Sequence, residues 1–223
     1  MKKILPNIRA MAFMLPILVL NLTYSLIDKY ANTDKTLITS LDNSIPFVKQ
    51  FVMAYVMWFA LVPLVFLYVC IKDKETFVRM LVSMVCGLLI SYITFFFFQT
   101  TVPRPNLVGN DIFTDIIRII YNTDRPYNCF PSIHVMNCLL MIQGMWVAKN
   151  KNTPLAIVIT ILNVLVILST LFIKQHVVLD AVFGAAIAII AFTLTNIFMR
   201  EKAMNFCRKI YRLTDFNNIS EVK

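Results

Sequence analysis

Six runs of mostly apolar residues dominate this sequence, and their length limits what the chain can fold into. They cover approximately residues 10–27, 51–71, 78–98, 133–148, 155–173 and 177–198. The hydrocarbon core of a bilayer is about 30 Å thick, so a helix needs roughly 20 apolar residues to cross it. The runs are continuous, whereas the strands of a membrane barrel alternate apolar and polar residues. Since only helices and closed barrels satisfy every backbone group in lipid, we expect an all-α polytopic bundle of six transmembrane helices.

The composition indicates one integral membrane domain over residues 1–223. Hydrophobic residues make up 59% of the chain and charged residues only 15%. A soluble domain carries about 25% charged residues, so this chain has too few to cover a water-facing surface. The 5 cysteines show no paired spacing and predict neither a disulfide framework nor a zinc site.

The uneven distribution of Lys and Arg predicts how the chain is oriented. Fourteen of the 21 lie at the N-terminus, in the second and fourth connections and in the tail 200–223, while the other seven lie in loops 28–50, 99–132 and 174–176. Cytoplasmic segments of membrane proteins carry the excess of Lys and Arg. We therefore expect an integral protein of the plasma (cytoplasmic) membrane with both termini inside and these three loops outside. The net charge of +9 then reflects topology, and no nucleic-acid partner is expected.

The only two histidines of the chain, His134 and His176, open the fourth and sixth runs. Both of these helices begin at the outer face, so the two imidazoles reach the same depth. Asp180 follows His176 by four residues and lies on the same helical face. Its carboxylate can accept a hydrogen bond from the His176 ring, which fixes the tautomer and raises the basicity of the other nitrogen. Ionisable residues at membrane depth are costly and usually functional, so we expect these three to form a site.

Several cations and two helix N-termini accompany the histidines at the outer face. Arg104 is fixed between two prolines, Arg125 and Lys174 are further candidate anion ligands, and Ser132 is placed to cap the fourth helix. Helix N-termini favour negative charge, and arginine can bind two phosphate oxygens at once. We predict a phosphate site in which one histidine attacks phosphorus and the other protonates the leaving alkoxide. A metal site built from the histidines and Asp180 is the competing interpretation.

These residues resemble the three motifs of the type 2 phosphatidic acid phosphatase superfamily, whose members carry them on a six-helix membrane bundle. The resemblance covers roughly residues 97–184. The family patterns are Lys, six residues, Arg-Pro; Pro-Ser-Gly-His; and Ser-Arg, five residues, His, three residues, Asp. The positions that match are Arg104, Pro105, Pro131, Ser132, His134, Ser169, His176 and Asp180. Phe97, Ile133 and Thr170 stand where the family has Lys, Gly and Arg.

The resemblance implies a role for each matching polar residue. His176 resembles the nucleophile, Asp180 its orienting partner and His134 the general acid, while Arg104 and Ser132 resemble phosphate ligands. It implies neither a metal nor another cofactor. Because two family cations are missing, this site should bind a highly charged pyrophosphate less well than a fully equipped one.

Together these features predict a metal-independent membrane lipid phosphatase that acts through a phosphohistidine. Its partners would be membrane lipids, with phosphatidic acid or a polyprenyl phosphate or pyrophosphate as substrate. The FPS-x-H sequence that ends at His134, with Lys-Gln-His downstream at residues 174–176, also looks like the branch that includes inositolphosphorylceramide synthase and sphingomyelin synthase-like enzymes. Those enzymes transfer a phospho-headgroup to an alcohol, which makes such a transferase the first alternative. A non-catalytic lipid-binding or transport bundle is the second.

Overall fold

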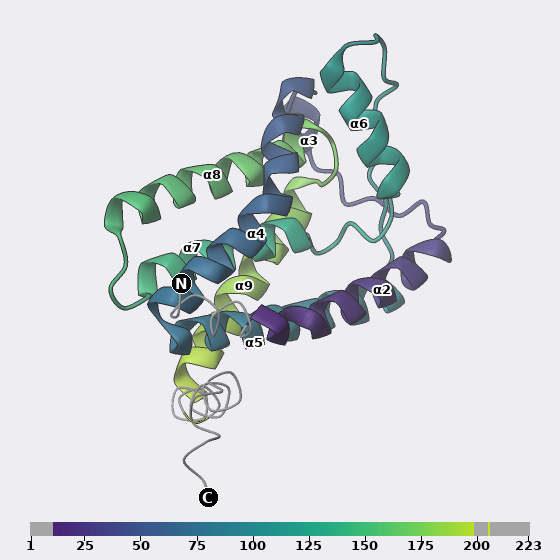
Figure 1. Ribbon diagram of the computed structural model, residues 1–223. Helices are drawn as coiled ribbons and strands as arrows, with labels where there is room; N and C mark the ends of the chain where they lie inside the picture. Colours follow the sequence, from purple (N-terminus) through teal and green to yellow (C-terminus); the bar gives the residue numbers. More distant parts are fainter. Residues whose placement is uncertain (1–10, 199–204, 206–223) are drawn as a thin grey trace, which may run out of the picture.

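The computed structural model describes residues 11–198 and Asn205, and this part of the chain forms helices without strands (Figure 1). The predicted N-terminal basic residues and the tail 200–223, Asn205 excepted, lie outside the described residues. The helices in chain order are η1 (Met11–Met14), α2 (Leu15–Lys29), α3 (Ser40–Ser44), η2 (Lys49–Phe51), α4 (Val52–Lys72), α5 (Lys74–Phe97), α6 (Ile112–Thr123), α7 (Ile133–Val147), α8 (Thr153–Phe172) and α9 (Val178–Phe198).

The six apolar runs correspond to α2, α4, α5, α7, α8 and α9. Within the described chain, α4, α5, α8 and α9 are the four helices long and apolar enough to cross a membrane. α2 and α7 have 15 residues each, which at about 1.5 Å per residue is less than a full hydrocarbon core. The all-α membrane fold is therefore confirmed, with four helices of full spanning length and two shorter ones where six transmembrane helices were predicted.

Polar side chains set where the long helices begin. Asp73 separates α4 from α5, and its carboxylate accepts the backbone N–H groups of Glu75 at 3.1 Å and Thr76 at 3.3 Å. The same carboxylate accepts the N–H of Lys149 at 3.0 Å, which ties this turn to the end of α7. Asn152 caps α8 in a similar way. These contacts satisfy N–H groups that a helix cannot pair within itself.

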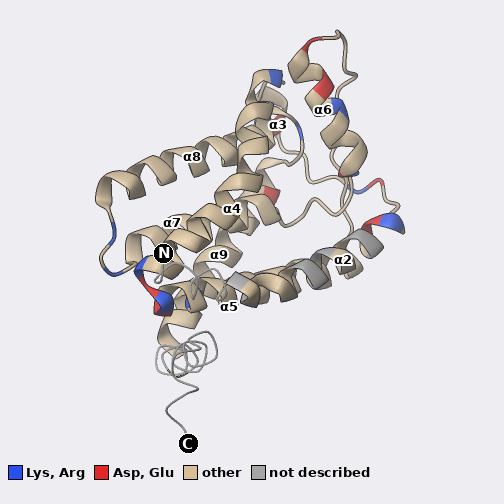
Figure 2. Cartoon of the chain, viewed as in Figure 1, with Lys and Arg blue, Asp and Glu red and all other residues tan. Residues whose placement is uncertain are grey.

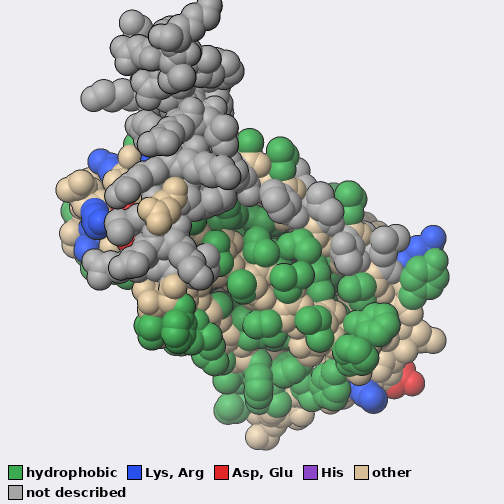
Figure 3. Space-filling view, turned by 90° about the horizontal axis from the view of Figure 1, so that it is seen from below, with side chains coloured by type: hydrophobic (Ala, Val, Ile, Leu, Met, Phe, Trp, Pro, Cys, Tyr) green, Lys and Arg blue, Asp and Glu red, His purple; other side chains and the backbone are tan. Residues whose placement is uncertain are grey.

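The surface of the bundle divides into apolar sides and charged ends. Lys, Arg, Asp and Glu gather in the connections and at the helix ends (Figure 2), and hydrophobic side chains cover much of the face seen from below (Figure 3). Leu64 is 61% exposed and Phe96 68% exposed. Such an apolar surface is unfavourable in water and matches a lipid environment.

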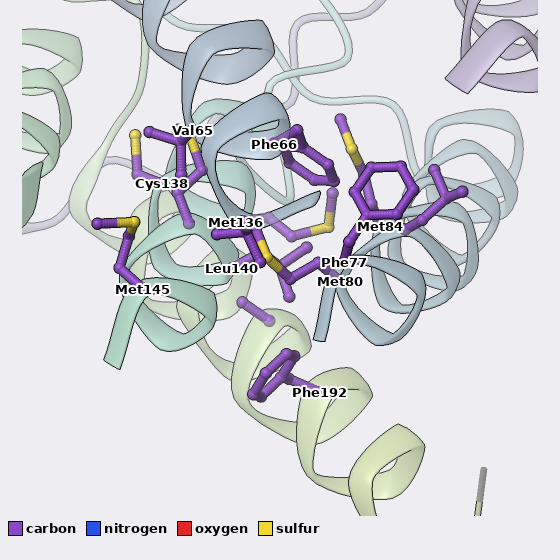
Figure 4. Packing of buried hydrophobic residues seen from close by; sticks show 14 of the residues in the cluster. Val65, Phe66, Phe77, Met80, Met84, Met136, Cys138, Leu140, Met145 and Phe192 are labelled. Carbon is purple, nitrogen blue, oxygen red and sulfur yellow. The ribbon is translucent and has the colours of Figure 1, made fainter. Parts of the chain in front are cut away.

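The interior is filled by large apolar side chains around α7, which packs against α4, α5, α8 and α9. Phe66 of α4, Phe77 and Met80 of α5 and Leu140 of α7 meet in this core (Figure 4). A Cβ atom on Gly144 would lie only 2.0 Å from the sulfur of Met80. The missing side chain thus lets α5 and α7 approach closely.

The two long connections at one end of the bundle contain helices that the apolar runs did not predict. We call this end, where α4, α7 and α9 begin and α5 and α8 finish, the histidine end. The connection 28–50 contains α3, and the connection 99–132 contains α6. Ile117 and Ile120 of α6 pack with Tyr55 of α4. The second connection therefore covers the histidine end instead of forming an open loop.

Candidate active site

His134 and His176 lie in contact at the histidine end, with Asp180 beyond them. The Nε2 atom of His176 is 3.4 Å from Nδ1 of His134, and Nδ1 of His176 is 3.4 Å from Oδ2 of Asp180. The three side chains form a line with His176 in the middle. Because Nδ1 of His176 contacts the carboxylate, Nε2 is the ring nitrogen that can react with a substrate. The structure thus brings together three residues that lie up to 46 positions apart in the sequence.

Asp180 is fixed in the first turn of α9. The residue is 1% exposed, and its Oδ2 atom also accepts the N–H of Val177 at 3.0 Å. Its Oδ1 atom has no hydrogen-bond partner among the described residues. A buried carboxylate with an unused oxygen strongly favours a proton donor or a positive charge beside it. Asp180 is therefore suited to hold an N–H on Nδ1 of His176 and to stabilise a cationic ring.

The start of α7 and the start of α9 touch through their backbones. The N–H of Ser132 donates to the carbonyl of Asp180 at 3.0 Å, and a Cβ atom on Gly184 would lie 2.4 Å from the carbonyl oxygen of Ser132. The Ser132 hydroxyl, a predicted phosphate ligand, is fully buried and accepts the N–H of Val135 at 3.3 Å as the N-cap of α7. In this structure Ser132 therefore positions His134, two residues further along.

A short helix from the first long connection holds the turn that precedes α9. Oδ1 of Asp42 in α3 accepts the N–H of Val178 at 2.7 Å. Lys174 Nζ donates to the carbonyls of Asp42 at 3.2 Å and Ile45 at 2.6 Å. Burial raises the pKa of Asp42, but hydrogen bonds from Thr39 and Val178 outweigh it and hold the pKa below its ordinary value. Asp42 is thus a negative charge at the positive end of α9.

Asp42 lies outside the three motifs, although a local sequence signal marks it. Thr39 and Asp42 form a capping box, in which the N–H of Thr39 donates to Oδ2 of Asp42 at 2.8 Å. A Thr followed three residues later by an acidic residue is a recognisable helix start. The signal predicts α3, but it carries no information that α3 contacts a turn 136 residues away.

Two predicted phosphate ligands, Lys174 and Arg125, bind backbone carbonyls. Lys174 is held by α3 and does not line the cavity beside the histidines. Arg125 does line that cavity, but its Nη1 atom donates to the carbonyls of Asp28 at 2.8 Å and Lys29 at 3.3 Å, at the end of α2. The structure therefore places Arg125 near the histidines and directs Lys174 elsewhere.

Arg104 is tied to the segment around α6 and to Gln175. Its Nη1 atom donates to the Tyr121 carbonyl at 2.9 Å, and its Nη2 atom donates to the Asp124 carbonyl at 2.7 Å and to Oε1 of Gln175 at 2.6 Å. The guanidinium carbon lies 4.1 Å from the centre of the Tyr121 ring. Burial raises the pKa of Tyr121 to about 12, so this ring stays neutral. Arg104 reaches the residue next to His176 rather than the histidines themselves.

Gln175 is a polar cavity residue that was not among the predicted site residues, although it belongs to the Lys-Gln-His sequence that ends at His176. Because a guanidinium only donates, its contact with Arg104 assigns the amide oxygen to that side and turns the NH₂ group away. The Nε2 atom is buried and has no partner among the residues described. Gln175 and His176 both line the cavity. An amide NH₂ in this position can donate to an anion bound at the histidine.

A cavity of about 560 Å³ opens beside the histidines and has aromatic walls. Tyr24, Tyr92 and Phe95 form one cluster, and Tyr55, Trp58 and Phe59 form another. Tyr55 and Trp58 also pack against the His134 ring at tilted angles, with centroids 4.8 Å and 4.5 Å away. The carboxylate of Asp124 joins the two clusters, because it accepts the hydroxyl of Tyr24 at 3.0 Å and that of Tyr55 at 3.5 Å.

The two positions that lack a family cation have different surroundings. Phe97 is 79% exposed at the end of α5 and does not line the cavity. Thr170 is fully buried, and its carbonyl accepts the N–H groups of Gln175 at 2.9 Å and His176 at 3.1 Å. Thr170 thus supports the turn that carries His176, through its backbone.

These features define a helical membrane protein with a paired-histidine site at one end of its bundle. Within the described part of the chain, no group of three or more His, Cys, Asp and Glu side chains is placed to hold a metal ion. A sequence model of the PAP2 superfamily matches residues 34–194, a range that contains His134, His176, Asp180 and the predicted phosphate ligands. The chain belongs to the PAP2 superfamily, which confirms the resemblance seen in its motifs.

Membership supports a general class of chemistry for the protein. PAP2 proteins are generally phosphatases or phosphotransferases, and the match supports phosphatase-type chemistry on lipid phosphates. The family and the apolar helices together make the chain an integral membrane protein. No curated protein and no solved structure gives a significant match to the chain.

Proposed function

We propose that this protein is a membrane lipid phosphatase that hydrolyses a lipid phosphate through a phosphohistidine on His176, without a metal. The observation that carries the proposal is that His134 and His176 contact each other on the wall of a cavity and that Asp180 contacts His176 from behind, with both nitrogen contacts at 3.4 Å. This arrangement supplies a nucleophile, a group that orients it and a proton donor for the leaving group.

In the first step, Nε2 of His176 attacks phosphorus. An N–P bond forms, the P–O bond to the lipid alkoxide breaks, and a protonated His134 gives its proton to the departing oxygen. Asp180 holds the N–H on Nδ1 and stabilises the positive charge that develops on the ring. The two histidine nitrogens lie 3.4 Å apart, so a phosphoryl group bound between the rings would replace this contact.

In the second step, water takes the place of the lipid alcohol. His134, now neutral, accepts a proton from the water as its oxygen attacks phosphorus. The N–P bond breaks, inorganic phosphate leaves, and both histidines return to their starting states. One residue thus acts as acid and then as base, as the reversibility of proton transfer requires.

The donors around the site suit a monophosphate. Gln175 offers an unpartnered NH₂ group, and Arg104 orients this amide by donating a hydrogen bond to its oxygen. The N-termini of α7 and α9 add partial positive charge. Because positions 97 and 170 carry Phe and Thr, the site has less positive charge to balance a second phosphate. We therefore propose a lipid monophosphate, such as phosphatidic acid, ahead of a pyrophosphate.

Phosphate release by purified protein in EDTA tests this function. Detergent-solubilised wild type should release inorganic phosphate from phosphatidic acid or a polyprenyl phosphate. His176→Asn, which keeps a polar side chain of similar length, should reduce the rate to background. Asn163→Leu is a matched control, because Asn163 is buried in α8 outside the site. Full activity in His176→Asn, or activity that disappears with EDTA, would reject the mechanism.

Transfer of the phospho-headgroup to an alcohol is a second candidate, and the wall around Asp124 favours it. A carboxylate repels further phosphate charge but accepts hydrogen bonds from hydroxyl groups. The Asp124 carboxylate lines the cavity and already binds the hydroxyls of Tyr24 and Tyr55. An alcohol bound there would replace water in the second step and lose its proton to His134.

Product analysis separates hydrolysis from transfer. The protein is incubated with a radiolabelled phospholipid donor, with and without inositol, diacylglycerol or ceramide as acceptor. A new phosphodiester lipid that Asp124→Asn abolishes supports transfer, whereas release of the free phospho-headgroup alone, or of inorganic phosphate when the donor is phosphatidic acid, supports hydrolysis. Lipid binding without either product over this panel would instead favour a non-catalytic bundle.

The orientation of the site is a further part of this proposal. From the distribution of Lys and Arg we propose that both termini are cytoplasmic and that the histidine end faces outward from the plasma membrane. Asn106 lies in the connection before α6, at the histidine end. A cysteine at position 106, in a variant without the native cysteines, should react with a membrane-impermeant maleimide on intact cells. Labelling only after permeabilisation would show that the histidine end faces the cytoplasm.

A further inference from the structure

A second cavity of about 440 Å³ lies next to the first and extends along the membrane-spanning part of the bundle. Side chains from α2, α4, α5 and α7 line it, and most of them are aliphatic, aromatic or Met. Trp58, Phe59 and Ile133 line both cavities. The two cavities therefore share a wall directly beneath the histidines.

The position of the second cavity follows from its residues on α4 and α7. The Trp58 ring lies 4.5 Å from the ring of His134. Asn137 stands three residues after His134 and so lies about one turn further into the bundle. Pro63 and Leu88 lie near the middle of the long helices α4 and α5. A molecule whose phosphate reached His176 could thus extend past Trp58 into this cavity.

Two residues that line this apolar cavity each carry a buried polar atom without a hydrogen-bond partner. The indole Nε1 of Trp58 and Oδ1 of Asn137 are both buried and unpaired among the described residues. Asn137 is 1% exposed. Buried polar groups are nearly always paired, because leaving one unpaired is costly. A donor and an acceptor that remain unpaired on the wall of one cavity therefore point to a ligand that carries polar groups at this depth.

We propose that the second cavity binds the upper part of the lipid chain, and that Trp58 and Asn137 hydrogen-bond the ester, amide or hydroxyl group that links this chain to the phosphate-bearing end. This inference rests on the proposed placement of phosphate at His176. Glycerol- and sphingoid-based lipids carry such a group a few bonds from their phosphate. A polyprenyl phosphate carries none, so it would leave both polar atoms unpaired.

Matched substrates test the inference through selectivity. Oleoyl lysophosphatidate and oleyl phosphate share a chain and a phosphomonoester, but only the first has a polar linkage. The wild type should prefer the first by at least tenfold in kcat/KM. Trp58→Phe, which removes the N–H but keeps a ring, and Asn137→Leu should each reduce this ratio about tenfold, equivalent to about 1.4 kcal/mol. Ceramide 1-phosphate and dioleoyl phosphatidate then distinguish an amide linkage from an ester.

Asn163→Leu is the matched control for these variants. Asn163 is also fully buried and its Oδ1 also lacks a partner among the described residues, but it lines neither cavity. Its replacement should leave the selectivity ratio unchanged. An equal loss of selectivity in Asn163→Leu, or no preference in the wild type, would overturn the inference.

A binding measurement separates this inference from the proposed hydrolysis. The chain has two tryptophans, and Trp146, which is 40% exposed, can be replaced by Phe so that only Trp58 fluoresces. In that variant, with His176→Ala added, lysophosphatidate brominated in the upper chain should quench Trp58 saturably at a low mole fraction. Brominated oleyl phosphate should need about tenfold more lipid to reach the same quenching.

The outcomes are distinguishable. Saturable quenching by the linked lipid, without phosphate release from any lipid by the wild-type protein, supports the cavity and rejects the phosphatase. Equal quenching by both lipids, with phosphate release intact, rejects the cavity and keeps the phosphatase.

Discussion

Gly184 of α9 lies against the backbone of Ser132, so close that a Cβ atom would stand 2.4 Å from the Ser132 carbonyl oxygen. The N–H of Ser132 also donates to the carbonyl of Asp180 at 3.0 Å. This backbone contact sets the separation between the start of α7, which carries His134, and the start of α9, which follows His176. The proposed chemistry depends on that separation.

Gly184→Ala should therefore disturb the site as well as the packing. The new methyl group meets a backbone atom, which cannot move aside alone, and such overpacking costs about 1–3 kcal/mol. We expect a lower melting temperature in detergent and at least a tenfold lower kcat. Gly87→Ala is the control, because a Cβ there meets the sulfur of the flexible Met136 at 2.4 Å. Similar losses in both variants would show that the Gly184 contact has no special role.

His134→Ala should lower the rate of the first step much more for lipid phosphates than for substrates with a good leaving group. A general acid contributes about 10²–10⁴ in rate when the leaving group is a poorly stabilised alkoxide. An aryl phosphate leaves without that proton, so its first step needs His134 far less. Burst kinetics with p-nitrophenyl phosphate and turnover of phosphatidic acid measure the two cases. Equal loss on both substrates would remove His134 from the role of acid.

Substitutions of Arg104 and Gln175 should have non-additive effects on KM. Gln175→Leu removes the unpartnered NH₂ group and should raise KM for a lipid phosphate about tenfold. Arg104→Leu should have a similar effect, because the arginine holds the amide oxygen at 2.6 Å. If Arg104 acts through Gln175, the double variant is little worse than either single one. Additive losses would show that Arg104 contacts the phosphate independently.

The contact between Asp42 and α9 should contribute to the free energy of unfolding at neutral pH, and this contribution should disappear in acid. The pKa of Asp42 is lowered in the fold, so the unfolded state binds its proton more readily. This contribution to stability is fully present when the pH is above the pKa of about 3.9 that an aspartate has in the unfolded chain. It is lost as the pH falls from that value toward the lower pKa of the folded protein. The melting-temperature difference between wild type and Asp42→Asn should therefore shrink from pH 7 to pH 3.

An exposed aspartate of the same connection controls for charge alone. Asp34→Asn should show no such pH-dependent difference. Asp42→Asn should also lower kcat with little change in KM, because Asp42 positions the turn before α9 without touching substrate. A constant melting-temperature difference across this pH range would contradict the role assigned to Asp42.

The apolar runs predict most of the fold, because lipid imposes one strong rule on helix length and composition. The same rule does not detect α6, whose 12 residues are too few to cross a bilayer. Its apolar residues 112, 113, 116, 117, 119 and 120 nevertheless follow a helical period. The length of an apolar run therefore does not reveal α6, although α6 covers the site.

The candidate site was predictable where residues are close in sequence or share a depth. The pair His176–Asp180 follows from helical spacing, and His134 from the direction of its helix. The contacts of Lys174, Arg104 and Gln175 depend on where distant connections fold back. No local pattern encodes those contacts, so the cations predicted as free ligands are found on backbone carbonyls and on an amide.

The central claim is that His176 carries the phosphoryl group. Wild-type protein is mixed with lipid phosphate labelled with ³²P in the presence of EDTA, quenched in alkali to preserve an N–P bond, and analysed by peptide mapping. The account predicts label on the peptide that contains His176, absent in His176→Asn and increased in His134→Ala with an aryl phosphate donor. Rapid phosphate release by the wild type with no protein-bound label, or label that persists in His176→Asn, would contradict it.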